Sequence, residues 1–291
     1  MQLNRLKCPI LRLLLMAALC LGAPGLASAQ GDAKRGAYTA KLAGCIGCHT
    51  DTKPGATPYA GGRALHTPFG VFYGPNITPH KDAGLGAWSE ADFTRALRQG
   101  ERPDGAHYFP AFPYASFTAM SDSDIKDLWA FLKSLPPVNK PNKEHDLKFP
   151  FGWRFLVTFW KWMFFGASAQ TTTAQVTPEV QRGAYIARAL AHCGECHTPR
   201  NFLGGSKSAQ WFAGAKLPEG WAPNLTPTRL KKWSDADLKS YLQTGMTPDS
   251  DVAAEPMNEV ITNTTSQLNP ADMAALIAYL RTVPALPEEK K

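Results

Sequence analysis

The sequences CIGCH at residues 45–49 and CGECH at residues 193–197 decide how this chain of 291 residues folds. Each motif carries two cysteines three positions apart and a histidine directly after them. One turn of helix then presents both thiols to the vinyl groups of a haem, and the histidine supplies the proximal ligand of the iron. The motifs therefore predict two covalently bound haem c groups. Their predicted attachment residues are Cys45, Cys48, Cys193 and Cys196, and their predicted proximal ligands are His49 and His197.

Cysteine pairs at this spacing also occur in redox-active dithiols and in zinc sites. Neither alternative explains the histidine that follows both pairs, and no further zinc ligands lie nearby in the sequence. The other two cysteines, Cys8 and Cys20, precede a predicted cleavage site. We therefore assign the four cysteines of the mature chain to haem rather than to disulfide bonds, although the predicted compartment is an oxidising one.

Residues 1–29 have the composition of a secretory signal peptide. Arg5, Lys7 and Arg12 precede an apolar run that is too short to favour a permanent membrane span, and small residues at 27–29 offer a cleavage site. Removal of the peptide lowers the formal net charge from +7 to +4, and we expect no nucleic-acid partner. The predicted location is the periplasm, with or without a peripheral contact to a membrane.

Segments around the first motif return around the second. RGAYTAKLAGCIGCHT at 35–50 matches RGAYIARALAHCGECHT at 182–198, and PNITP at 75–79 matches PNLTP at 223–227. WSEADFTRALRQG at 88–100 matches WSDADLKSYLQTG at 233–245. Such a repeat predicts two tandem domains. The predicted boundaries are 30–140 for the first domain, 141–175 for a linker rich in aromatic residues, and 176–291 for the second domain.

Each repeat is predicted to be mostly helical. Ser89 and Ser234 are expected to cap helices, because acidic residues follow in the first turn and a glycine ends each run. In the last helix of each repeat, at 124–136 and 272–284, apolar residues recur every three or four positions. Long loops rich in glycine and proline join the helices, and loops of this length are expected to wrap a bound group. No strand series is predicted, so the expected fold class is all-α.

The sixth ligand of each iron separates an electron carrier from a catalyst, because a methionine thioether closes the iron and raises its reduction potential. In the second repeat we predict Met257, with Met246 as a rival, while Met273 follows the helix pattern and is expected in the core. In the first repeat Met120 is the only methionine and the predicted ligand. His107, or an open site, remains the alternative there.

Four segments together resemble the cytochrome c subunits of bacterial periplasmic dehydrogenases that act on alcohols, aldehydes or gluconate. They are NITPHKDAGLGAWSEADFTRALRQG from residue 76, DGAHYFPAFPYASFTAMSD from 104, FWKWMFF from 159, and RGAYIARALAHCGECHTPRNFLGG from 182. The resemblance implies two class I cytochrome c domains. Many relatives have a methionine where Phe112 stands, and others use the later one, which is Met120 here. Alcohol-type relatives carry a third haem domain, so this sequence looks like a dihaem version.

The function implied is electron transfer rather than catalysis. Electrons would come from the catalytic subunit of a flavin, quinoprotein or molybdenum dehydrogenase and leave to a cytochrome, a quinone or an oxidase. The alternative is a stand-alone dihaem enzyme of the peroxidase or thiosulfate-oxidising type. That enzyme would need an open or unusually ligated haem, and the uncertain sixth ligand of the first haem keeps this alternative open.

The predicted linker contains FGWRFLVTFWKWMFFGA, from Phe151 to Ala167. As a helix it would rise about 25 Å, near the lower limit for a membrane span. A span would carry Arg154 and Lys161 into lipid and would separate the two haem domains. We therefore expect a helix that packs between the domains, or a contact surface for lipid or for a partner.

Overall fold

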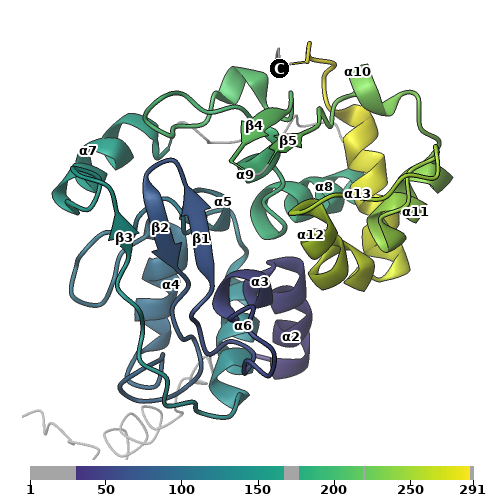
Figure 1. Cartoon of the computed structure of the whole chain (residues 1–291). Coiled ribbons are helices and arrows are strands. Elements are labelled where there is room, and N and C mark those ends of the chain that lie inside the picture. Colours follow the sequence, from purple (N-terminus) through teal and green to yellow (C-terminus); the bar gives the residue numbers. More distant parts are fainter. Residues whose placement is uncertain (1–30, 167–176, 219, 289–291) are drawn as a thin grey trace, which may run out of the picture. The chain divides into compact units, whose positions relative to one another are not determined.

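A computed structural model describes residues 31–166, 177–218 and 220–288 (Figure 1). The predicted signal peptide lies outside these residues. The helices of the first repeat are α2 (Ala33–Leu42), α3 (Cys45–His49), α4 (Glu90–Gln99), α5 (Tyr114–Phe117) and α6 (Asp122–Ser134). Those of the second repeat are α8 (Pro178–Tyr185), the π-helix η2 (Ile186–Leu190), α9 (Gly194–His197), η3 (Ser208–Gln210), α10 (Pro227–Leu230), α11 (Asp235–Thr244), α12 (Met257–Asn263), η4 (Thr265–Gln267) and α13 (Pro270–Thr282). Helix α7 (Phe155–Phe164) lies in the predicted linker.

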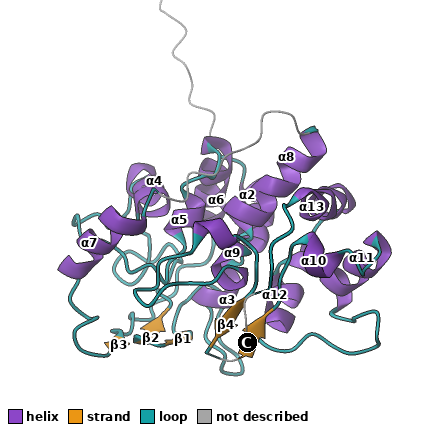
Figure 2. Ribbon diagram, turned by 90° about the horizontal axis from the view of Figure 1, so that it is seen from above, coloured by secondary structure: helices purple, strands orange, loops and turns teal. Residues whose placement is uncertain are grey.

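Short strands lie in the loops between the helices, and the sequence did not predict them (Figure 2). In the first repeat β1 (Ala64–Thr67), β2 (Gly70–Tyr73) and β3 (Asp146–Leu147) form an antiparallel sheet in that order. In the second repeat β4 (Ala215–Leu217) pairs with β5 (Gly220–Ala222). Strands of two to four residues leave too short a pattern to be recognised in sequence. The prediction that both repeats are mainly helical is confirmed, and the structure adds these two small sheets in the loops.

The predicted helix caps are confirmed. The side chains of Ser89 and Ser234 each accept a hydrogen bond from the backbone amide of the third residue of the helix, and the aspartate side chain of that residue accepts one from the cap backbone amide. Gly100 and Gly245 end the same helices in the left-handed conformation that glycine adopts without strain. Matching caps at matching positions give α4 and α11 the same length of ten residues.

The π-helix η2 accounts for the one extra residue in the second attachment segment, 182–198, relative to the first, 35–50. From Arg35 to Cys45 the chain advances ten residues, whereas from Arg182 to Cys193 it advances eleven. A wide turn with π hydrogen bonding accommodates one extra residue within a helix. Helix α8 and its extension η2 therefore occupy the place that α2 occupies alone in the first repeat.

The first and last helices of each repeat cross at a glycine. A Cβ atom built on Gly36 would lie 1.8 Å from the carbonyl oxygen of Asp127, and one built on Gly183 would lie 1.9 Å from that of Ala275. These two crossings, α2 with α6 and α8 with α13, are equivalent in the repeat. Only the absence of a side chain allows backbones to approach so closely.

One hydrophobic core extends through both repeats. It joins Leu128 of α6 and Leu97 of α4 to Leu276 of α13 and Leu242 of α11. Met273 lies in it at 1% exposure, as predicted. The described chain from Gly31 onward accordingly forms a single compact unit rather than two separate ones.

The described part of the predicted linker packs against the first repeat. Strand β3 extends the sheet of β1 and β2 (Figure 1). Val157 of α7 forms a second small core with Phe72 and Phe109. Helix α7 also reaches the second repeat, where the indole nitrogen of Trp160 donates to the carbonyl of Leu203 at 3.0 Å. Among the described residues, no helix combines the length and the apolar character needed to cross a bilayer.

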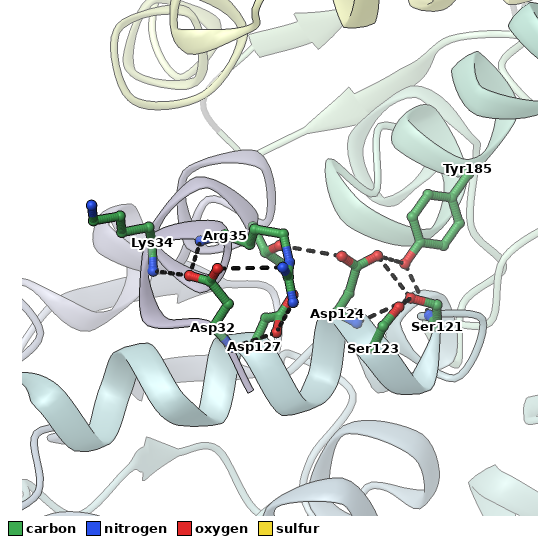
Figure 3. Close-up of polar contacts among 9 residues, drawn as sticks. Asp32, Lys34, Arg35, Ser121, Ser123, Asp124, Asp127 and Tyr185 are labelled. Carbon is green, nitrogen blue, oxygen red and sulfur yellow. Dashed lines mark hydrogen bonds and ion pairs between the residues drawn. The ribbon is translucent and has the colours of Figure 1, made fainter. Parts of the chain in front are cut away.

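Two tyrosines join the repeats reciprocally. Tyr38 of α2 donates to Asp272 of α13 at 2.8 Å and accepts from the amide of Asn269 at 3.0 Å. At the equivalent positions Tyr185 of α8 donates to Asp124 of α6 at 2.5 Å and accepts from the amide of Ser121 at 2.9 Å, as Figure 3 shows. Burial raises the pKa of each tyrosine to about 12, so both remain donors at neutral pH.

An arginine of each first helix binds a carboxylate of the last helix of its own repeat, and in the second repeat this is the same Asp272 that Tyr38 binds. Arg182 binds Asp272 through two nitrogens at 2.7 and 2.8 Å, and Arg35 binds Asp127 at 2.7 and 3.0 Å (Figure 3). The hydrogen bonds from Arg35 hold the pKa of Asp127 below its ordinary value. Burial alone would raise the pKa of Asp272, but Arg182 and Tyr38 outweigh it and the net shift is downward.

Replacing Gly36 or Gly183 with alanine should destabilise the protein by about 1–3 kcal/mol or more, because the helices must separate to admit the methyl group. Chemical denaturation measures the loss. Gly152→Ala is the control, since its nearest atom would lie 3.9 Å away, and it should change stability by less than about 0.5 kcal/mol. Equal effects at Gly36 and Gly152 would contradict the close crossing.

The stability of the protein should fall as the pH drops below about 4, the ordinary pKa of aspartate. Asp127 and Asp272 titrate at lower pH in the folded than in the unfolded chain, so below that pH the unfolded state binds more protons and is favoured. Unfolding followed between pH 7 and pH 3 should show a shallower fall for Asp127→Asn than for the wild type. Identical pH profiles would contradict this contribution.

Candidate haem-binding sites

Both attachment motifs form one helical turn with the same surroundings. The Nδ1 atom of His49 lies 2.7 Å from the carbonyl oxygen of Pro75, and that of His197 lies 2.7 Å from that of Pro223. Burial lowers the pKa of each imidazole, and the carbonyl acts in the opposite direction. A neutral imidazole that donates from Nδ1 presents an unprotonated Nε2, which is the form that binds iron.

The four thiols do not resemble reactive or metal-binding cysteines. In the described part of the chain they form no disulfide bond. Burial raises the pKa of Cys45 and Cys193 to about 12 and that of Cys48 to about 11, whereas dithiol catalysts and zinc sites use thiolates. No cluster of three metal-ligating side chains occurs among the described residues. Protonated, half-buried or exposed thiols beside the predicted proximal histidine fit thioether attachment of haem.

The loop that follows each motif forms a backbone hydrogen bond with it. The amides of Gly61 and Gly214 donate to the carbonyls of His49 and His197 at 2.8 and 2.9 Å. In the first repeat a Cβ on Gly74 would lie 1.8 Å from the carbonyl of Cys48. The loop thereby brings Pro75 to the histidine ring.

The asparagines of the two PN-TP segments anchor these loops to the end of each repeat. Asn76 donates to the carbonyl of Val138 at 2.8 Å, and Asn224 donates to that of Leu286 at 3.0 Å. These bonds hold each PN-TP loop, and with it the proline carbonyl beside the histidine, to the chain that follows the last helix.

The two predicted methionine ligands do not occupy equivalent positions. Met257 opens α12 and is a half-buried residue that packs against the core. Met120 is 2% exposed and directly precedes the α6 cap, just as the core residue Leu268 precedes the α13 cap. One backbone bridge pairs Glu101 with His107 in the first repeat, and the other pairs Met246 with Val252 in the second. The two loops are thus equivalent at an offset of 145 residues. At that offset Phe112 is the counterpart of Met257. The distal segment of the first domain is therefore built differently from that of the second.

The rival ligands have other surroundings. The Nδ1 atom of His107 lies 3.0 Å from the ammonium of Lys161, and burial together with that cation lowers its pKa. A neutral His107 thus accepts a hydrogen bond from α7. Met246 is 52% exposed in a loop of the second repeat.

The sequence did not predict the contacts of Tyr38 and Tyr185, which join the two repeats. Their signal was present, since RGAY occurs at equivalent places in both repeats, but the partner of a repeated residue lies in the other copy and leaves no local pattern.

Comparison with known proteins gives a family and a set of relatives. The cytochrome c family matches residues 33–136 and 180–284. A dihaem cytochrome c-type protein of Cereibacter sphaeroides is 43% identical over 89% of this chain and 88% of its own length. The fructose dehydrogenase cytochrome subunit of Gluconobacter japonicus is 40% identical over 87% of this chain and 53% of its own length. The gluconate 2-dehydrogenase cytochrome c subunit of Pantoea cypripedii is 34% identical over 92% of this chain and 64% of its own length. The chain thus spans most of the first relative and between half and two thirds of the other two.

Proposed function

The chain belongs to the cytochrome c family, with one such domain in each half and a haem c bound covalently in each, and on this premise we propose that it carries electrons from the catalytic subunit of a dehydrogenase to a respiratory acceptor. Two relatives are cytochrome subunits of fructose and gluconate dehydrogenases. The observation that carries the proposal is the pair of intact attachment motifs with identically oriented histidines. When bound, each haem iron alternates between ferric and ferrous and holds one electron at a time.

The chain's own residues orient and tune the iron rather than act on a substrate. The bond from Nδ1 to the proline carbonyl fixes each ring and raises the basicity of its ligating nitrogen. The acceptor would be a cytochrome, a quinone or an oxidase, reached in the periplasm, where the predicted signal peptide would direct the chain. The reported relatives favour this carrier over a stand-alone dihaem enzyme.

Met257 is our assignment for the sixth ligand in the second domain, and Met120 for that in the first. Met257→Leu should remove half of the methionine-to-iron charge-transfer band of the ferric protein and lower one of the two reduction potentials, because a thioether ligand raises the potential. Met120→Leu should do the same for the other haem. Potentiometry with absorption spectroscopy measures both effects.

Two variants serve as controls for this assignment. Met246→Leu removes an exposed methionine and should change neither band nor potential. If Met120→Leu left the spectrum intact while His107→Gln changed it, His107 would replace Met120 as the ligand. A high-spin haem in the wild type would contradict both assignments.

Helix α7 supplies the surface on which we place the catalytic subunit. Its outer face, together with the turn before it, exposes Trp153, Phe155, Phe159, Trp162 and Met163; Trp162 is 85% exposed. We call these five residues the aromatic face. Aromatic residues and methionine are enriched in the cores of protein interfaces.

The cations of α7 decide between a protein and a lipid partner. The Lys161 ammonium is turned inward, where it donates to the carbonyl of Gln99 at 2.6 Å. The guanidinium of Arg154 donates to the carbonyl of His107 at 2.9 Å and lies over the ring of Phe109. Helices that lie on anionic membranes direct their cations toward the lipid headgroups. An uncharged aromatic face favours a protein partner.

Replacing Phe159 and Trp162 together with serine should reduce co-purification with the dehydrogenase at least about tenfold, since both would be central interface residues. The measurement is the fructose, gluconate or ethanol dehydrogenase activity, with an artificial acceptor, that is retained by the tagged cytochrome. Val252→Ser, at a 69% exposed residue outside the face, is the control. Unchanged dehydrogenase capture, combined with lost binding to phosphatidylglycerol vesicles, would assign the face to lipid instead.

A further inference from the structure

His192 holds a backbone conformation that suits another residue. Its φ is +39°, in the left-handed region that L-residues seldom adopt. The residue before the first motif is Gly44, with φ +61°. Glycine adopts this conformation without strain, so the backbone alone does not explain a histidine in the second repeat. The reason must lie in its side chain.

The side chain of His192 reaches the first repeat. Its ring meets that of Phe117 of α5 edge to face, with centroids 5.5 Å apart. Burial lowers the pKa of the imidazole, while Glu195 and the main chain of Ala43 act in the opposite direction. The Phe117 contact places the imidazole against the first repeat, where η2 and α2, the helices that lead into the two attachment motifs, also pack together.

Other contacts also join each motif to the opposite repeat. The hydroxyl of Ser116 donates at 3.0 Å to Glu195, which lies between Cys193 and Cys196. Across the same interface Glu259 of α12 forms an ion pair with Arg63 at 2.7 Å. A Cβ built on Gly47, which lies within the first motif, would be 3.4 Å from the carboxylate of Glu259. Each motif is thus contacted by a helix of the other domain, the second motif by α5 and the first by α12.

We propose that His192 is a positioning residue that ties the two haem-attachment segments together and so keeps the two haem groups at a constant separation for one-electron exchange. In that exchange a ferrous haem gives one electron to the ferric haem of the other domain, and no atom or proton is transferred. The role rests on the proposed carrier function, since it matters only if electrons pass between the domains.

The test compares holoprotein carrying His192→Gly with the wild type. The variant should keep both haems and fold at least as well, because glycine relieves the backbone strain. The rate at which a photo-injected electron redistributes between the haems should fall about 2- to 30-fold, the range for loss of one coupling contact. A second readout is independent of electron flow: amide hydrogen exchange at Ala43 and Gly44 should accelerate.

Two further variants sharpen the comparison. Ser250→Gly relieves the same strain at an exposed loop residue with φ +62°, and it should change neither readout. His192→Asn keeps a hydrogen-bond donor and tolerates this backbone, so it should recover part of the loss. Unchanged redistribution and unchanged exchange in His192→Gly would overturn the role of His192. Failure of the dehydrogenase to reduce the wild type would instead overturn the carrier function.

Discussion

The hydrogen bond from the histidine of each attachment motif to a proline carbonyl is the constraint on which the rest of the structure depends. It joins the attachment motif to the PN-TP loop, and the asparagine of that loop joins it to the chain beyond the last helix. The last helix in turn crosses the first at a glycine, and the first helix leads back into the motif. In each domain, contacts therefore connect the attachment motif, the PN-TP loop, the last helix and the first helix in a ring that begins and ends at one histidine. The orientation of that imidazole therefore depends on all of these elements being in place.

The two domains contact each other in the way that the two subunits of a symmetric dimer do. The tyrosine of each first helix binds the carboxylate of the other domain's last helix, and the hydrophobic core runs through both domains. Self-complementary contacts of this kind normally relate two copies of one chain. Here both copies lie in one polypeptide, so they have been free to diverge. The distal segments show it, since a phenylalanine stands in one domain where a methionine opens a helix in the other.

Much of this architecture was predictable because its determinants are local. The attachment motifs, the helix caps at Ser89 and Ser234 and the core position of Met273 each depend on residues within a turn or two. The small strands escaped prediction because they are too short to show an alternating pattern. The contact of Tyr38 with Asp272 spans 234 residues, and no local pattern encodes it. For α7, the spacing placed Arg154 and Lys161 on one side, but only packing could show that this side faces the protein.

The π-helix η2 shows how such divergence can be contained. In a regular α-helix one inserted residue rotates everything before it by about 100° relative to everything after it. Gly183 and Tyr185 would then turn away from the crossing and from the partner domain. The wide turn places the extra residue between these positions and Cys193, so the rotation is confined to one segment. The insertion is thus confined to a local bulge, and the contacts of Gly183 and Tyr185 are kept. The attachment segment of the second domain could therefore change in length without loss of the contacts between the two domains.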